Sequence, residues 1–364
     1  MALSYNIVTV DVNVIQAATA STLQKSGAIV SLGGTTQTVG TKAFYPDLPA
    51  VTAVVGTSGN FADVAGYATQ FFDQGSTIGV WILELGVVTT PALGITALQT
   101  WITANPGIFY AYLVPVEFDS GSTAWTTFLS DYISPGAMTY FYTPSTSGTY
   151  SQYTSAMKDV FWYVPSTTGS PYEVAMAFQS MLANAPSSAS LVPQMNYRFM
   201  FGGVPWVIAG NTTAINAILT AGGNLMTNAA QGGISGNILR GGTYADGNQV
   251  NFWYAIDWIN INVNLQLSNA VINGSNTTSN PLYYNQNGIN SLRSVAQQTV
   301  NNAISFGLLL APAAVTATPF YTYTTANPGD YKAGVYNGLA LTATPQLGID
   351  SITFNFTATN IPIG

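Results

Sequence analysis

The most constraining feature of this sequence is a regular alternation of strand-like and helix-like segments between residues 27 and 192. Residues 27–32 and 78–83 are apolar runs typical of buried strands, whereas residues 61–72 and 93–104 carry apolar side chains at helical spacing. The same alternation continues with a strand at 108–114, a helix at 122–133, strands at 138–142 and 161–164, and a helix at 172–185. We therefore predict an α/β fold, with a core sheet of the βαβ type that is covered by helices.

In the second half of the chain the regular alternation of strand-like and helix-like segments ends. Glycine pairs at 222–223, 232–233 and 241–242 indicate loops and tight turns. Helical spacing predicts a helix over 289–304 that ends at Gly307, and residues 312–328 are predicted to form a loop or linker. We divide the chain into a strand arm with its tether (1–26), an α/β domain (27–192), a second α/β and helical part with Gly-rich loops (193–330), and a C-terminal segment with a strand arm (331–364).

Residues 258–267 are compatible with two structures. Apolar residues alternate strictly with Asn and Gln, which by itself favours a strand because Asn is a poor residue for helix interiors. On a helix, the same stretch would align one apolar face, made by Phe252, Ile256, Ile259, Val263, Leu267 and Ala270.

Both ends of the chain carry a strong strand pattern, in which apolar and polar residues alternate as in a strand with one buried face. Such strands can complete the sheet of their own chain or pair with a sheet of a neighbouring subunit, and the pattern does not choose between the two. The positions that would carry this pairing are Ile7, Val8, Val10, Val12 and Val14 at one end and Ile352, Phe354, Phe356 and Ala358 at the other.

The surface of this protein must be almost free of charge. Only 6% of the residues are charged, against roughly 25% in an ordinary globular protein, although 48% are hydrophobic. A surface of neutral hydroxyl and amide groups is easily dehydrated and does not repel its own copies, so it favours assembly. The seven cationic residues are scattered along the chain and form no basic stripe, which argues against direct binding of nucleic acid.

The residue types that carry most enzyme chemistry are missing. The chain has no His and no Cys, which excludes imidazole bases, thiolate nucleophiles and the usual zinc ligands. The glutamates Glu84, Glu117 and Glu173 are dispersed, and no pair of carboxylates stands out. We expect no enzyme activity, no metal and no cofactor. No secretory signal and no membrane-spanning segment is visible, so we also expect no membrane insertion.

Two short motifs resemble known sites without completing them. Ser155 and Lys158 match the S-x-x-K of penicillin-recognising serine enzymes, but the companion Lys-Thr-Gly is absent, and a polar turn is favoured. Residues 56–59 (GTSG) follow the strand-like residues 51–55 and precede a helix, as a phosphate-binding turn does. They complete neither common phosphate-loop pattern, which favours a purely structural turn.

Several stretches taken in order resemble contractile bacteriophage tail sheath proteins. They are IVTV at 7–10 with GAIV at 27–30, ATQFFDQG at 68–75, the A-D-G and D-W of residues 244–258, PLYYNQNGI at 281–289 and the closing strand. The resemblance covers most of the chain and favours the helix over 258–267. In one respect the chain departs from the family, because it has far fewer Arg and Lys residues, which puts a charge-based contact between sheath and tube in doubt.

The resemblance implies a structural role. Sheath subunits form a helical homopolymer around an inner tail tube, and their terminal strands exchange with neighbouring subunits. The sheath contracts when the baseplate triggers it and drives the tube through the host envelope. The implied partners are further copies of the chain, the tail tube protein, and the baseplate and tail terminator proteins. The implied location is the virion tail, assembled in the cytoplasm of the host bacterium.

Two other classes of protein share part of this composition. A non-viral surface-layer or lectin-like protein that assembles with itself would also be acidic and rich in Thr and Asn, but it would carry a signal peptide and usually calcium sites. A nucleotide-dependent enzyme on the same α/β sheet would need a complete phosphate loop.

Overall fold

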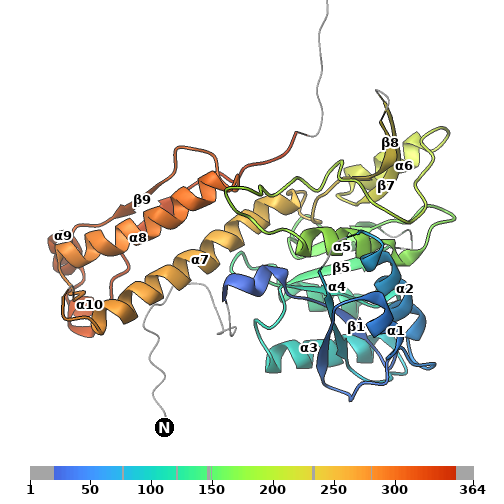
Figure 1. The fold of residues 1–364 in the computed structure, drawn as a ribbon, viewed down its shortest axis with the longest axis horizontal. Coiled ribbons are helices and arrows are strands. Elements are labelled where there is room, and N and C mark those ends of the chain that lie inside the picture. The colour runs from blue at the N-terminus through green and yellow to red at the C-terminus, as the bar shows by residue number, and fades with distance from the viewer. Residues whose placement is uncertain are drawn as a thin grey trace, which may run out of the picture.

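A six-stranded sheet lies at the centre of the first half of the chain (Figure 1). The computed structural model describes residues 20–75, 78–119, 122–145, 148, 150–231, 234–279 and 281–349. The strand order is β2-β3-β1-β4-β5-β6, and all neighbours are parallel except β2, which is antiparallel to β3. The strands are β1 (Gly27–Ser31), β2 (Lys42–Tyr45), β3 (Val80–Glu84), β4 (Ala111–Leu113), β5 (Tyr140–Pro144) and β6 (Val160–Tyr163).

Helices cover both faces of this sheet, which confirms the predicted βαβ core (Figure 1). Helices α2 (Phe61–Phe72) and α5 (Val174–Leu182) pack on one face. Helices α3 (Pro91–Ala104), α4 (Thr123–Ser130) and α6 (Thr212–Thr220) pack on the other. We call the segment from β1 to α5 the α/β body. Short 3-10 helices occur at η1 (Ala20–Lys25), η2 (Val116–Phe118), η3 (Tyr150–Gln152) and η4 (Pro171–Glu173).

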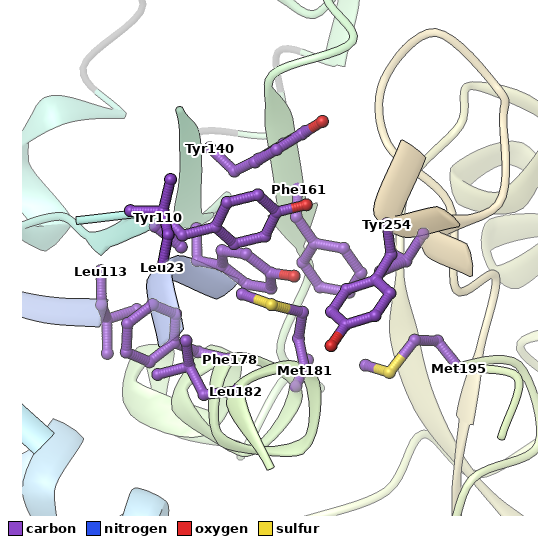
Figure 2. Close-up of a cluster of buried hydrophobic side chains, with 14 of the residues drawn as sticks. Leu23, Tyr110, Leu113, Tyr140, Phe161, Phe178, Met181, Leu182, Met195 and Tyr254 are labelled. Carbon is purple, nitrogen blue, oxygen red and sulfur yellow. The ribbon is translucent and has the colours of Figure 1, made fainter. Parts of the chain in front are cut away.

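The core of the α/β body is built largely from aromatic side chains. Figure 2 shows one part of it, where Tyr110, just before β4, and Tyr140 and Phe161 from the sheet lie near Phe178 from α5. On the other face, Phe141 of β5 contacts aromatic rings of both β4 and α4. Burying a large apolar side chain contributes about 1.5–3 kcal/mol, so such a core makes the body strongly cohesive.

A β-hairpin extends the body beyond β6. Its strands are β7 (Leu225–Gln231) and β8 (Ile234–Arg240), which pair antiparallel. Asn224 joins the hairpin to the sheet, because its backbone N–H donates to Trp162 O and its carbonyl accepts from Val164 N. The outer edge of β6 is therefore covered by the chain itself.

The second half of the chain forms a helical hairpin that projects from the body (Figure 1). Its two long helices, α7 (Val250–Ser275) and α8 (Gln286–Ser305), pack side by side. The first turns of α7 pack into the body, and a small sheet lies against α8. We use the name helical hairpin for the segment from α7 to β10, whose remaining elements are β9 (Ala314–Ala317), α9 (Phe320–Ala326), α10 (Pro328–Ala333) and β10 (Leu339–Thr342).

The helix predicted over 258–267 is confirmed as part of α7. Ile259 and Ile261 are both buried although they stand two residues apart, because this helix packs against neighbours on more than one side. Asn262 donates from its side-chain amide to the Trp258 carbonyl one turn earlier. Burial of the apolar residues therefore outweighs the poor helix propensity of the asparagines.

The strand suggested at 51–55 is wrong, since residues 48–52 form the short helix α1 (Leu48–Thr52). Its start is fixed by an N-cap, which the apolar pattern of the valines at 51–55 did not indicate. The Asp47 carboxylate accepts a hydrogen bond from Ala50 N at 2.8 Å, and Pro49 lies in the first turn. Both features favour the start of a helix.

Two other expectations need correction. Residues 312–328 are not a loop or linker, because they contain all of β9 and all of α9. The strand β9 exists through its pairing with β10, which lies more than twenty residues later, and local periodicity does not reveal such a partner. The end of the expected N-terminal tether is also structured, since residues 20–25 form η1 against α7.

Candidate functional site

The strand order reverses between β1 and β4, the point where doubly wound sheets usually bind ligands. Here the loop after β1 is held by the buried carboxylate of Glu84. Its Oε1 accepts from Gly33 N and Gly86 N, both at 2.7 Å, and its Oε2 accepts from the hydroxyls of Ser31 at 2.6 Å and Thr35 at 2.7 Å. Backbone N–H groups that could have bound a phosphate are thus used by the protein itself.

The N-terminus of α2 borders the same point and is also closed by side chains of the chain. The Asn60 Oδ1 accepts from Leu32 N at 2.7 Å, which ties the start of α2 to the end of β1. The Asp63 carboxyl group lies in the first helical turn and accepts from Val116 N at 3.1 Å. The GTSG segment in front of α2 therefore forms a structural turn, and a bound anion would meet a carboxyl group there.

Asp63 has a second acidic neighbour, Glu117. Burial, and in second place the nearby charge of Glu117, together raise the pKa of Asp63 to about 7. Two carboxyl groups that share one proton can serve acid–base chemistry when they face a substrate cleft. Here Glu117 is exposed to solvent and Asp63 is buried against the η2 turn. The pair makes the body sensitive to pH, and its geometry defines no reaction.

The other candidate catalytic residues are kept apart. Ser155 is exposed, whereas Lys158 is buried and donates from Nζ to the Ala137 carbonyl at 2.6 Å. The Lys158 ammonium also lies 4.7 Å from the ring centre of Trp253 on α7. Glu173 is buried in a capping box at η4 and accepts from the Tyr163 hydroxyl. Within the described ranges, no group of three or more acidic residues could hold a metal ion.

The small sheet of the helical hairpin has one closed edge. Alternate residues of β9 point their backbone groups away from β10. At this outer edge the side-chain amide of Gln297 on α8 replaces a neighbouring strand. Its Nε2 donates to Ala313 O at 3.1 Å, and its Oε1 accepts from Val315 N at 2.8 Å. The β9 edge is therefore blocked to an incoming strand.

Within the part of the chain that the structure describes, no strand pairs with the other edge of the same sheet. The pairing of Ala340 with Thr316 directs the backbone groups of Leu339 and Leu341 away from β9. These groups form no hydrogen bond with any residue that the structure describes. The side chains of Leu339 and Leu341 are half-buried and pack against the main core cluster. A two-stranded sheet is marginal on its own, so this edge is a ready place for strand addition.

The strands predicted at the two termini lie outside the described residues, and so do all nine of their pairing positions. What sequence analysis missed is the edge that could receive such a strand. The sequence pattern that could have indicated this edge is short, because β10 contains only Leu339 and Leu341 in alternation with Ala340 and Thr342. Within the described ranges, no helix combines the length and the apolar character of a membrane span.

Comparison with solved structures gives long matches at low sequence identity. The chain is similar to the helical sheath of the anti-feeding prophage in its contracted state, with a TM-score of 0.62 and 11% identity over 97% of this chain and 100% of that one. It is also similar to a sheath tail protein from Listeria innocua, with a TM-score of 0.52 and 11% identity over 82% of this chain and 91% of that one.

A third similar structure is a chain in the baseplate of the anti-feeding prophage, also contracted, with a TM-score of 0.56 and 14% identity over 98% of both chains. No protein-family model matches the sequence, and no curated protein matches it either. The chain therefore has the fold of contractile sheath proteins, in a sequence that has diverged far from theirs.

Proposed function

We propose that this chain is the structural subunit of a contractile tail sheath, which polymerises into a helical tube around an inner tail tube and contracts to drive that tube through a host envelope. The observation that carries the proposal is the match to a sheath chain over 97% of this chain and 100% of the other. The neutral surface supports it, because subunits with few charges stack without strong repulsion. The same match favours a sheath over a surface-layer or lectin-like protein.

The terminal strands are proposed to link the subunits. The C-terminal pattern offers Ile352, Phe354, Phe356 and Ala358 on one face, and the N-terminal pattern offers Ile7, Val8, Val10, Val12 and Val14. A strand added beside β10 would continue the apolar face that Leu339 and Leu341 turn toward the helices. Because Gln297 closes the β9 edge, added strands enter on the β10 side.

The proposed sheath needs no enzyme activity of its own. Its energy would be stored during assembly and released when interfaces between rigid subunits repack in discrete steps. The proposed partners are further copies of this chain, the tail tube protein, and the baseplate and tail terminator proteins. The proposed location is the virion tail, with assembly in the cytoplasm of the host bacterium.

Electron microscopy of the purified full-length protein tests this function. We expect regular hollow tubes of stacked rings, because identical subunits in a head-to-tail array that does not close make a filament. Particles that remain monomeric at high concentration, or that close into small symmetric oligomers, would contradict the proposal. A Leu341→Pro variant removes one outward N–H from β10 and is expected to prevent tube formation, whereas Leu341→Val retains it.

A further inference from the structure

The segment that leads to the N-terminus is fastened to the start of α7. Leu23 of η1 is buried in the same cluster as Tyr254 of α7 (Figure 2). The neighbouring residue Gln24 is also buried, and its Nε2 donates to the Tyr254 backbone carbonyl at 2.9 Å. The chain enters the body at Ser26, whose carbonyl accepts from Tyr110 N beside β4. This root of the N-terminus is therefore tied to α7 before it joins the sheet.

The segment that leads to the C-terminus is fastened to the same helix. Gln249 stands at the N-cap of α7, yet its side chain makes no cap hydrogen bond. Its amide pairs instead with the backbone of Gly348, with Oε1 accepting from Gly348 N at 2.8 Å and Nε2 donating to Gly348 O at 3.2 Å. A Cβ atom at position 348 would clash with the side chain of Gln194, so a larger residue would fit here only if that side chain moved.

The same turns of α7 are anchored to the sheet by a buried acid. Asp257 is completely buried, and its Oδ2 accepts from the hydroxyls of Tyr110 at 2.8 Å and Tyr140 at 2.7 Å. One turn earlier, Trp253 lies under the Lys158 ammonium. Charge-assisted hydrogen bonds of this kind are strong, because the site is buried.

We propose that residues 249–257 form a single anchor, here called the α7 anchor, which holds both chain ends and transmits a pull on either of them to the sheet through Asp257. The inference rests on the proposed function, since the pull would come from neighbouring subunits that share the terminal strands. Gln249 and Asp257 lie about 12 Å apart along one rigid helix. A force on either segment, residues 20–26 or the segment at Gly348, is therefore transmitted to the other.

The α7 anchor also connects the roots to the edge that receives strands. Beyond Asp257, α7 continues to Ser275, which is a further rise of about 27 Å. The helix pairs with α8, and α8 supports β9 and β10. A small tilt of α7 at the anchor is thus magnified at the far end of the helical hairpin. Through this lever, a pull on the chain ends of one subunit would move the strand edge that it offers to the next.

Hydrogen exchange on the full-length chain, kept as dissociated subunits, tests the anchor. Gln249→Ala is expected to speed exchange of the Gly348 amide about tenfold, because the hydrogen bonds that protect it are lost. Gln24→Ala is expected to speed exchange in residues 20–26 to a similar extent. Gln298→Ala, which removes an exposed glutamine of α8, should change neither root.

Coupling is tested by Asp257→Asn, which touches neither root directly. We expect exchange to accelerate at both roots together. The matched control is Asp119→Asn, since Asp119 is also buried and accepts from a tyrosine hydroxyl, that of Tyr153 at 2.7 Å, but belongs to the loop after β4. Equal acceleration in the two aspartate variants would mean a general loss of stability and would overturn the anchor. Faster exchange at only one root in Asp257→Asn would overturn it as well.

Because exchange is measured on separate subunits, its result does not depend on tubes. Failure of the wild type to form tubes would overturn the sheath function and leave the exchange result to judge the anchor. If the wild type forms tubes, Gln249→Ala tubes are expected to dissociate at a lower urea concentration than Gln298→Ala tubes. Equal resistance of the two variants would refute the transmission of load through Gln249.

Discussion

The α/β body and the helical hairpin are held together in different ways. The body buries large rings between a sheet and two layers of helices, so that Phe141 alone contacts rings on β4 and α4. In the helical hairpin, α8 is buried through smaller residues, such as Ala296, Val300 and Ala303, and ring contacts such as that of Tyr284 with Phe320 lie at its far end. Its two-stranded sheet has one edge, that of β10, which is unpaired among the described residues. If the sheath proposal holds, this edge of the helical hairpin is the part suited to contact with other subunits.

The largest expected effect, and the clearest test of how assembly differs from folding, is that of changes in the C-terminal strand. Replacing both Thr353 and Asn355 by Pro should abolish tube assembly and leave the unfolding free energy nearly unchanged. The reason is that Pro removes ladder donors, which under the sheath proposal belong to a strand that pairs with a neighbouring subunit. Circular dichroism and sedimentation measure the two effects. Ala at both positions keeps the donors and should still assemble. An insoluble or unfolded double-Pro variant would show instead that the strand completes the sheet of its own chain.

The body should respond to loss of a ring by unfolding. Phe141→Ala removes a fully buried side chain, and such changes cost about 3–5 kcal/mol. Urea unfolding of the dissociated subunit measures the loss. Tyr321→Ala on the helical hairpin removes a ring that is 80% exposed, and it should change stability by less than about 0.5 kcal/mol. Comparable losses in the two variants would break the distinction between the regions.

A smaller effect is expected from a change at the closed β9 edge of the helical hairpin. Gln297→Ala removes both contacts to β9 and should lower stability by about 1–3 kcal/mol. The larger consequence should be seen in the assembly, because a second open edge invites irregular pairing. We expect bundled or aggregated tubes in electron micrographs. The neighbouring variant Gln298→Ala should form normal tubes, and normal tubes from Gln297→Ala would show that the amide does not guard the edge.

The pH dependence should be a property of the body. The pKa of Asp63 is raised to about 7 by burial and by Glu117, against about 3.9 in an unfolded chain. The folded protein therefore binds a proton more tightly, so the stability that this proton contributes is present below about pH 4 and is lost as the pH rises through 7. Burial likewise raises the pKa of Asp159, which also belongs to the body, to about 7. It raises the pKa of Asp257, in the first turns of α7 that pack into the body, to about 6.

We accordingly expect the protein to resist urea better at pH 5 than at pH 8. Asp63→Asn should reduce this difference by on the order of 1–2 kcal/mol, after allowance for partial screening by solvent. Asp73→Asn at the exposed end of α2 should leave it unchanged. Greater stability at pH 8 than at pH 5 would contradict the assignment.

The smallest expected effect is that of salt. Only 6% of the residues are charged, and Lys42 and Arg240 lie over aromatic rings. Surface ion pairs contribute little and are screened within about 10 Å at 0.1 M salt. Tubes formed in dilute buffer should therefore persist at about 0.5 M salt, far beyond the screening range. Their loss under these conditions would show that charge holds the subunits together after all.

Sequence patterns predicted the body well, because its helices and strands are specified locally. The helix predicted over 61–72 coincides with α2. The failures arose where a distant or single contact decides the structure, as with the Asp47 cap that turns residues 48–52 into a helix. The pairing of β9 with β10 is likewise non-local. The strand edge could not be predicted either, since its closure by Gln297 depends on the position of α8 beside β9.

The Gln297 contact also determines on which side the small sheet can accept a strand. With one edge of its small sheet closed and the other available, that sheet can accept added strands on the β10 side alone, so a polymer linked by strands donated to it would have a direction. An array of this kind would end with acceptor edges that no further copy fills. If the sheath proposal holds, one terminus of every tube stays reactive until a different protein occupies it, and the length of the tube must be decided there.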